Sequence, residues 1–256
     1  MADVHEIADG IFRIATFIPE ANITFNQFLI ADEKPLLFHT GQRLLFPLTL
    51  EAVRQVIDPT HLRYISWSHL EADESGALNE FLQIAPHAEP VHSELGVAVN
   101  VNDFAIRPAK TMGDGEVLDL GRHKLRFLIT PQVPHCWDAI LAFEETTGTL
   151  MASDLFTQLG EKTSMTSGDM VERTMASHKQ LPTYIPVSEH TAHVFDRLEA
   201  LQPGVLACMH GPAFSGDAVR ALRDLRTALF SQRDEALTRI GGGSQATPSK
   251  IGRAHV

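Results

Sequence analysis

Apolar residues alternate with turn-forming residues over the N-terminal part of the chain, and their spacing shifts between strand-like and helix-like periods. Compact apolar runs bounded by Pro, Asn and Asp predict strands at 11–17, 27–30, 36–39, 62–67 and 90–92. Apolar residues at helical spacing predict helices at 48–57, 75–84 and 94–99. We therefore expect an antiparallel meander that passes into a β-α-β-α alternation.

The C-terminal part shows the same change of period. Strands are expected at 117–120, 124–129, 139–143, 149–152 and 205–209. Helices are expected at 169–180, 187–201 and 217–239. Strands, an α/β alternation, strands and a second α/β alternation together predict an α/β protein with two mixed β-sheets flanked by helices.

A single domain, residues 1–240, accounts for all of these elements. Residues 241–256 begin with Gly241-Gly242-Gly243-Ser244 and contain almost no apolar cluster. Such a composition does not form a packed core, so we expect 241–256 to be a disordered tail outside the fold.

Composition narrows the range of partners. The 256 residues carry 21 Lys and Arg against 32 Asp and Glu, a formal net charge of −11, and we therefore expect no binding to a nucleic-acid backbone. No apolar run reaches the roughly 20 residues that a membrane helix needs, so no membrane association is expected. Two cysteines, Cys136 and Cys208, cannot form a disulfide framework, which favours a cytoplasmic location.

The segment from His69 to Glu74 carries four ionisable side chains directly after an apolar strand. If the segment stays extended, His69, Glu71 and Asp73 point to the same side. Imidazole together with carboxylates is a ligand set for iron, manganese or zinc rather than for calcium. The alternative is a solvated polar loop that caps a helix at Ser75.

Three further residues strengthen the interpretation as a metal site. His135, Asp154 and His210 each follow the end of an apolar strand. Active sites of α/β folds often collect at the C-terminal ends of their strands. Taken singly, each of these residues is typical of a turn, but their joint occurrence predicts that they meet the first segment in one site.

This pattern resembles the di-iron site of the metallo-β-lactamase fold as flavodiiron proteins use it. In those proteins the first motif is His-x-Glu-x-Asp, whereas hydrolases of the fold usually have His-x-His-x-Asp-His. The intervals of 61, 18 and 55 residues that separate Asp73, His135, Asp154 and His210 in turn also fit the resemblance. It implies an αββα sandwich of the metallo-β-lactamase type over about residues 5–235.

The resemblance also implies a role for each ligand. The first iron would be held by His69, Glu71 and His135, and the second by Asp73 and His210. Asp154 would bridge the two irons through its carboxylate. Zinc or manganese is the alternative to iron, and Glu71 favours iron because it makes the first site harder and more anionic.

Two departures from the family pattern bear on function. Flavodiiron proteins carry a flavodoxin-like domain that binds FMN, and we expect no FMN site within this chain, which then resembles the stand-alone oxygen-binding di-iron proteins. The family commonly has His directly after the motif's Asp, where this chain has Glu74. Asp73 and Glu74 are the candidate catalytic carboxylates beside the second metal, and whether Glu74 coordinates is left open.

Other residues receive structural interpretations. Of the 13 histidines, three are candidate ligands. His39 is expected to support the metal loop, Trp67 to pack in the core, and both cysteines to be small buried hydrophobic residues. His178, His190 and His193 lie in the region that covers the site in this fold, where a substrate role is the alternative to a structural one. His190 and His193 are expected to form a surface pair. His5, His61, His87, His92 and His123 are expected at the surface.

Three functions fit the predicted site. The first is a di-iron protein that binds or reduces O₂ or NO, either as a sensor or carrier or as a reductase supplied by a separate electron-donor protein. The second is a hydrolase of phosphodiester, thioester or lactone substrates that uses a metal-bridging hydroxide. The third is oxidation of an organic small molecule. A homodimer is left open.

Overall fold

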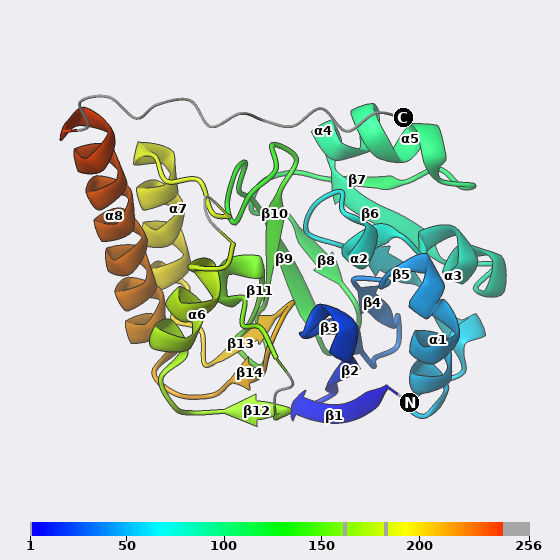
Figure 1. Ribbon diagram of the computed structural model, residues 1–256. Coiled ribbons are helices and arrows are strands. Elements are labelled where there is room, and N and C mark those ends of the chain that lie inside the picture. Colours follow the sequence, from blue (N-terminus) through cyan, green and yellow to red (C-terminus); the bar gives the residue numbers. More distant parts are fainter. Residues whose placement is uncertain (1, 161–162, 182–183, 243–256) are drawn as a thin grey trace, which may run out of the picture.

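Two β-sheets face each other between two layers of helices in the computed structural model, which describes residues 2–160, 163–181 and 184–242 (Figure 1). Each sheet contains seven strands, and each is built from one half of the chain. This confirms the predicted αββα sandwich. No helix in the described ranges is both long enough and apolar enough to cross a membrane.

The first sheet keeps its strands in sequence order. Its strands are β1 (Asp3–Ala8), β2 (Ile11–Ile18), β3 (Ile23–Ile30), β4 (Leu36–Phe38), β5 (Tyr64–Ser66), β6 (Glu89–Ser93) and β7 (Lys110–Met112). Neighbours from β1 to β4 are antiparallel, as the meander predicted, and neighbours from β4 to β7 are parallel. The parallel pairs need crossover connections, which the helices supply.

Helices α1 (Phe46–Arg54) and α3 (Leu78–Ile84) make two of these crossovers and pack on the outer face of the first sheet. Shorter helical segments complete this half: α2 (Ala72–Ser75), α4 (Glu94–Gly96), a π-helical turn (Val97–Val101) and α5 (Asn102–Phe104). Trp67 is buried in the apolar cluster between sheet and helices, as expected.

The second sheet has the order β12-β14-β13-β11-β10-β9-β8. Its strands are β8 (Val117–Asp119), β9 (Lys124–Ile129), β10 (Ile140–Glu144), β11 (Thr149–Ser153), β12 (Met165–Thr166), β13 (Val205–Cys208) and β14 (Ala213–Phe214). Three helices cover its outer face: α6 (Met170–His178), α7 (Glu189–Ala200) and α8 (Ala218–Gly242). The core between the two sheets includes Phe28, Phe38, Phe127 and Ile140, all fully buried.

Some expectations need correction. Strands β1, β7, β12 and β14 were missed. His92 and His123 are fully buried rather than at the surface. His123 lies between Asp32 Oδ2, 2.8 Å from its Nδ1, and the Asp9 carbonyl oxygen, 2.9 Å from its Nε2. The helix predicted to end at 239 runs to Gly242, and the rest of the expected tail, 243–256, lies outside the described residues.

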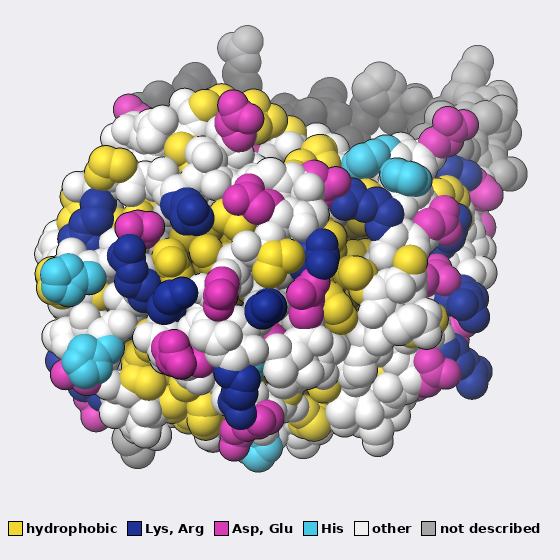
Figure 2. Space-filling model, turned by 180° about the vertical axis from the view of Figure 1, so that it is seen from behind, with side chains coloured by type: hydrophobic (Ala, Val, Ile, Leu, Met, Phe, Trp, Pro, Cys, Tyr) yellow, Lys and Arg dark blue, Asp and Glu magenta, His cyan; other side chains and the backbone are white. Residues whose placement is uncertain are grey.

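One face of the molecule is drawn in Figure 2. Basic and acidic side chains alternate over it, with apolar patches between them, and no continuous basic surface forms on this face.

Candidate metal centre

The candidate ligands follow the C-terminal ends of four strands, as predicted. His69, Glu71 and Asp73 lie between β5 and the first turn of α2, in the half that forms the first sheet. The second sheet provides the others, with His135 after β9, Asp154 after β11 and His210 after β13. Asp73 is helical rather than extended, so the expected alternation ends at Glu71.

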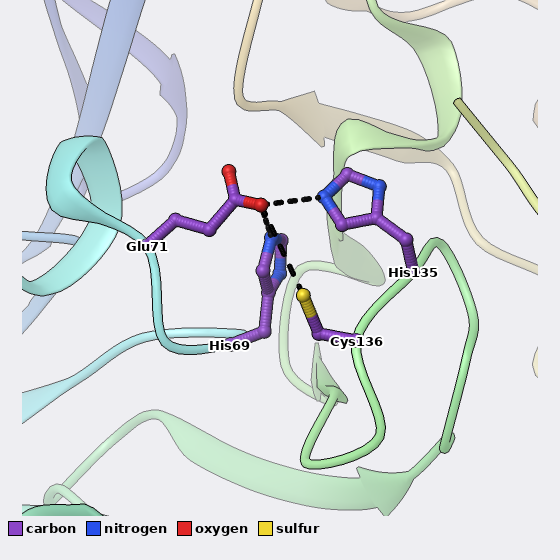
Figure 3. Close-up of side chains that lie close together, drawn as sticks. All are labelled: His69, Glu71, His135 and Cys136. Atoms are coloured by element: carbon purple, nitrogen blue, oxygen red, sulfur yellow. Dashed lines mark hydrogen bonds and ion pairs between the residues drawn. The ribbon is translucent and has the colours of Figure 1, made fainter. Parts of the chain in front are cut away.

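The first donor group consists of His69, Glu71 and His135 (Figure 3). Glu71 Oε1 is 3.6 Å from His69 Nε2 and 3.3 Å from His135 Nε2. Asp154 Oδ2 lies 3.5 Å from the same nitrogen of His69 and 3.4 Å from that of His135. These four side chains direct two nitrogens and two carboxylate oxygens toward one another.

The second donor group shares Asp154 with the first. Asp154 Oδ1 is 3.3 Å from His210 Nε2, and Asp73 Oδ2 is 3.3 Å from the same nitrogen. One oxygen of Asp154 therefore faces each group. This is the arrangement that a carboxylate bridge between two cations requires, and the structure thus brings all six predicted ligands together.

Hydrogen bonds at the opposite ring nitrogens fix the orientation of two histidines. His210 Nδ1 lies 2.9 Å from the Thr24 carbonyl oxygen, to which it donates. His69 Nδ1 is 3.1 Å from Ser68 Oγ and 3.3 Å from Glu74 Oε2. Metal-binding histidines typically hold their second nitrogen in this way, which directs Nε2 toward the metal.

Electrostatics show how strongly the site attracts positive charge. Burial alone would lower the pKa of His69, but the charges of Glu74, Glu71 and Asp154 raise it to about 10. Burial is likewise outweighed at His210, where Asp73 and Asp154 raise the pKa to about 9. Close contacts with His135 and His69 hold the pKa of Glu71 well below its usual range. Protons on the histidines thus balance the acids, and a metal ion would displace them.

Glu74 has a different place from the other acids. Its fully buried carboxylate accepts hydrogen bonds from the backbone N–H groups of Ser68 (3.1 Å) and His69 (2.7 Å) and from the Ser153 hydroxyl (3.0 Å). His39 Nε2, neutral because burial lowers its pKa to about 3, is 3.3 Å away. Glu74 contacts His69 at Nδ1, on the ring side opposite Nε2, and so orients this ligand.

The rim of the site contains residues that the sequence pattern did not select. The Tyr184 ring lies 4.7 Å from that of His135 and 5.7 Å from that of His178. Burial and the charge of Asp154 raise the pKa of Tyr184 above its usual range, so its hydroxyl stays neutral. Trp137, in the same loop as His135, is 44% exposed. A Tyr within a loop gives no sequence signal of this placement.

A second unpredicted feature fixes the turn after His210. Asn26 Nδ2 donates to the carbonyl oxygens of Cys208 (2.7 Å) and Gly211 (2.8 Å), and the Arg13 guanidinium donates to the latter at 3.0 Å. Gly211 has φ +109°, and a Cβ there would lie 3.0 Å from Gln158 Cβ. The available sequence signal was an Asn and an Arg within strands rich in apolar residues. Such polar side chains are rarely buried, and both are fully buried here.

Residues 23–211, more than half of the chain, match the family described as ODP family β-lactamase. The chain belongs to this ODP family. Flavo-diiron protein FprA2 of Clostridium acetobutylicum is 25% identical to this ODP-family chain over 250 residues, 88% of this chain and 62% of the relative. The resemblance to flavodiiron proteins is confirmed.

A second relative matches over a shorter segment at higher identity. It is putative diflavin flavoprotein A 1 of a Nostoc species, 37% identical over 136 residues. This match covers 52% of the ODP-family chain and 23% of the relative, so the chain aligns with about a quarter of that relative's length.

Solved structures show the same fold. Rubredoxin oxygen:oxidoreductase from Desulfovibrio gigas superimposes with a TM-score of 0.78 at 22% identity, covering 88% of this chain and 61% of that one. A fragment of putative diflavin flavoprotein A 5 from Nostoc gives a TM-score of 0.77 at 20% identity. This match covers 91% of the present chain and 98% of the fragment. Together with the two sheets and their flanking helices, these matches confirm the predicted fold class.

The donor set fits the di-iron centre for which the Clostridium relative is named. His69 Nε2 is fully buried and has no hydrogen-bond partner in the described part of the chain, although it faces two carboxylates. A buried polar atom that lacks a partner costs about 1–3 kcal/mol. A cation between the carboxylates and Nε2 satisfies all of these atoms at once.

Proposed function

We propose that this chain holds two iron ions and uses them to bind and reduce a diatomic gas, O₂ or NO, with electrons from a separate donor protein. The observation that carries the proposal is the shared carboxylate of Asp154, which directs one oxygen to each donor group. His69, Glu71 and His135 would hold one iron, and Asp73 and His210 the other. The names of the relatives, flavo-diiron protein and rubredoxin-oxygen oxidoreductase, support this choice over a hydrolase.

Glu71 supports iron over zinc. In the first donor group it occupies the position where hydrolases of the fold usually have His, and a carboxylate is a harder ligand than an imidazole. Its low pKa keeps it anionic at neutral pH, so the first group carries a permanent negative charge. Bound iron supplies the redox chemistry that a gas ligand needs.

The side chains around the donor groups would position the gas and handle its protons. The neutral Tyr184 hydroxyl is a potential hydrogen-bond donor, and it is close enough to Asp154, Asp73 and Glu71 for their charges to raise its pKa. Thr157 Oγ1 lies 3.4 Å from this hydroxyl and fixes its position. Glu74 keeps His69 oriented from behind and does not face the space between the donor groups.

The experiment compares iron and zinc over a graded series of ratios. The metal-free chain is incubated anaerobically with Fe²⁺ and Zn²⁺ from zinc excess to iron excess, its metal content is measured, and O₂ or NO consumption is followed with a chemical reductant. With Fe²⁺ in excess we expect two irons per chain, and gas consumption that follows the iron content. Zinc-loaded, colourless protein that cleaves bis(p-nitrophenyl) phosphate would instead establish the hydrolase.

A Glu71→His variant is the matched test of metal selectivity. This substitution restores the hydrolytic pattern while leaving the other five ligands in place. We expect the preference to move toward zinc. An unchanged preference would contradict the role given to Glu71.

A further inference from the structure

A thiol lies against the first donor group. Cys136 directly follows His135, and its Sγ is 3.9 Å from Glu71 Oε1. One donor atom each of His69, Glu71, His135 and Cys136 fall within 4.8 Å of one another. In Figure 3 the contacts of the other three side chains meet at the same Glu71 oxygen.

These separations suit a single metal ion. With metal–sulfur bonds of about 2.3 Å and metal–nitrogen or metal–oxygen bonds of about 2.0–2.2 Å, neighbouring ligand atoms of one metal ion lie roughly 3–3.6 Å apart. Glu71 Oε1 is 3.3 Å from His135 Nε2, 3.6 Å from His69 Nε2 and 3.9 Å from Cys136 Sγ. The sulfur thus lies a few tenths of an ångström beyond this range from Glu71 Oε1 and within 4.8 Å of the histidine nitrogens.

The backbone holds Cys136 at this place. Its φ is +64°, in the left-handed region that residues other than Gly rarely adopt. Its carbonyl oxygen accepts hydrogen bonds from the N–H groups of Gln132 (2.7 Å) and Ala139 (3.3 Å), which close the ligand loop. The loop therefore turns the thiol toward Glu71 rather than into the core.

Cys208 shows what a structural cysteine looks like in the same chain. It is fully buried in the apolar cluster between the second sheet and its outer helices, among residues such as Leu206 and Phe214. Cys136 is only partly buried. The prediction of a small buried hydrophobic residue is thus confirmed for Cys208 and wrong for Cys136.

A second observation points to a ligand at this place. The buried Nε2 of His69 belongs to the group of four and makes no hydrogen bond with any described residue. From these contacts we infer that Cys136 is a thiolate ligand of the first metal, in addition to His69, Glu71, His135 and the shared carboxylate of Asp154. The thiol proton leaves to solvent when the metal binds. The inference rests on the proposed metal centre and goes beyond its six expected ligands.

A thiolate changes the metal preference of the first site. Sulfur ligands favour iron, cobalt and zinc over manganese, which prefers oxygen ligands. The two donor groups therefore differ, since the second consists of Asp73, His210 and Asp154 without sulfur. The first site would select a thiophilic metal and the second would accept a harder one.

Cobalt provides the test, because sulfur bound to Co²⁺ gives an intense near-ultraviolet charge-transfer band that nitrogen and oxygen ligands do not give. The metal-free, full-length chain is titrated anaerobically with Co²⁺, and bound cobalt is counted by metal analysis. The same titration is done with Cys136→Ser, Cys136→Ala and the matched control Cys208→Ala.

We expect two cobalt ions in all four proteins, and the band in the wild type and Cys208→Ala alone. Loss of the sulfur ligand should weaken the first site at least roughly tenfold, the lower end of what outer partners of metal ligands contribute. Two bound cobalt ions without the band, or a band that persists in both Cys136 variants, would overturn the inference and leave the metal centre standing. Failure of the wild type to bind cobalt would overturn both.

Discussion

Removing the Glu74 carboxylate tests how the first ligand is held. In Glu74→Ala the backbone N–H groups of Ser68 and His69 lose their acceptor inside a fully buried site. Each orphaned donor costs about 1–3 kcal/mol, so the metal-free variant should lose about 2–6 kcal/mol of unfolding free energy. Glu74→Gln keeps an oxygen for both donors and gives up only charge assistance, so its loss should be about 1–2 kcal/mol.

Metal affinity should fall further in Glu74→Ala than in Glu74→Gln, as stability does. His69 Nδ1 loses its carboxylate partner in both variants, and substitution of such outer partners costs 10–100-fold in affinity. We expect affinity to fall about tenfold in Glu74→Gln and about a hundredfold in Glu74→Ala. Affinity is measured by competition with a chromophoric chelator, and stability by urea unfolding of the metal-free proteins.

Glu51→Gln is the matched control, because this carboxylate is 65% exposed and pairs only with Arg54 in the same helix among the contacts that the structure describes. It should change stability by no more than about 0.5 kcal/mol. A Glu74→Ala variant with a stability loss below about 1 kcal/mol and near-wild-type metal affinity would refute the role given to Glu74.

Three further substitutions test other parts of the structure. Asp154→Ala removes the oxygens shared by both donor groups, so bound metal should fall from two ions to at most one by metal analysis; two retained ions would exclude the bridge. Asn26→Ala leaves the buried carbonyls of Cys208 and Gly211 with fewer donors, and urea unfolding should show a loss of about 1–3 kcal/mol. Burial lowers the pKa of His92 to about 3 from 6.5, so the unfolded state binds the proton first and stability falls as pH drops below about 6.5. Between pH 7.5 and 5.5 the wild type should lose about 1.4 kcal/mol more than His92→Gln in the metal-free state, and parallel pH profiles would contradict this.

The sequence pattern predicted the elements that bury one face and missed those that do not. Strand β1 exposes much of its length, and β7 exposes Lys110 and Thr111, so neither shows the alternation that marks a half-buried strand. The strands β12 and β14 have two residues each, too few for any period to appear.

The ligands were predictable because their residue types and their places after apolar strands are local features. The roles of their neighbours were not, because they depend on contacts between distant segments. Glu74 meets Ser153, 79 residues away, and His123 meets Asp32, 91 residues away. A residue's burial and partner in such cases follow from how the two sheets pack, which the pattern of a single segment does not contain.

The division of the chain into two sheets has a consequence for how the centre is assembled. Neither donor group is complete within one half, because His69, Glu71 and Asp73 come from the first and the remaining three ligands from the second. During synthesis at roughly 5–20 residues per second, the 137 positions from Asp73 to His210 take about 7–27 s to make. Throughout that interval a nascent chain presents acids and imidazole without the partners that select the metal. Metal acquisition is therefore a late event that ties the two halves together after both have been made.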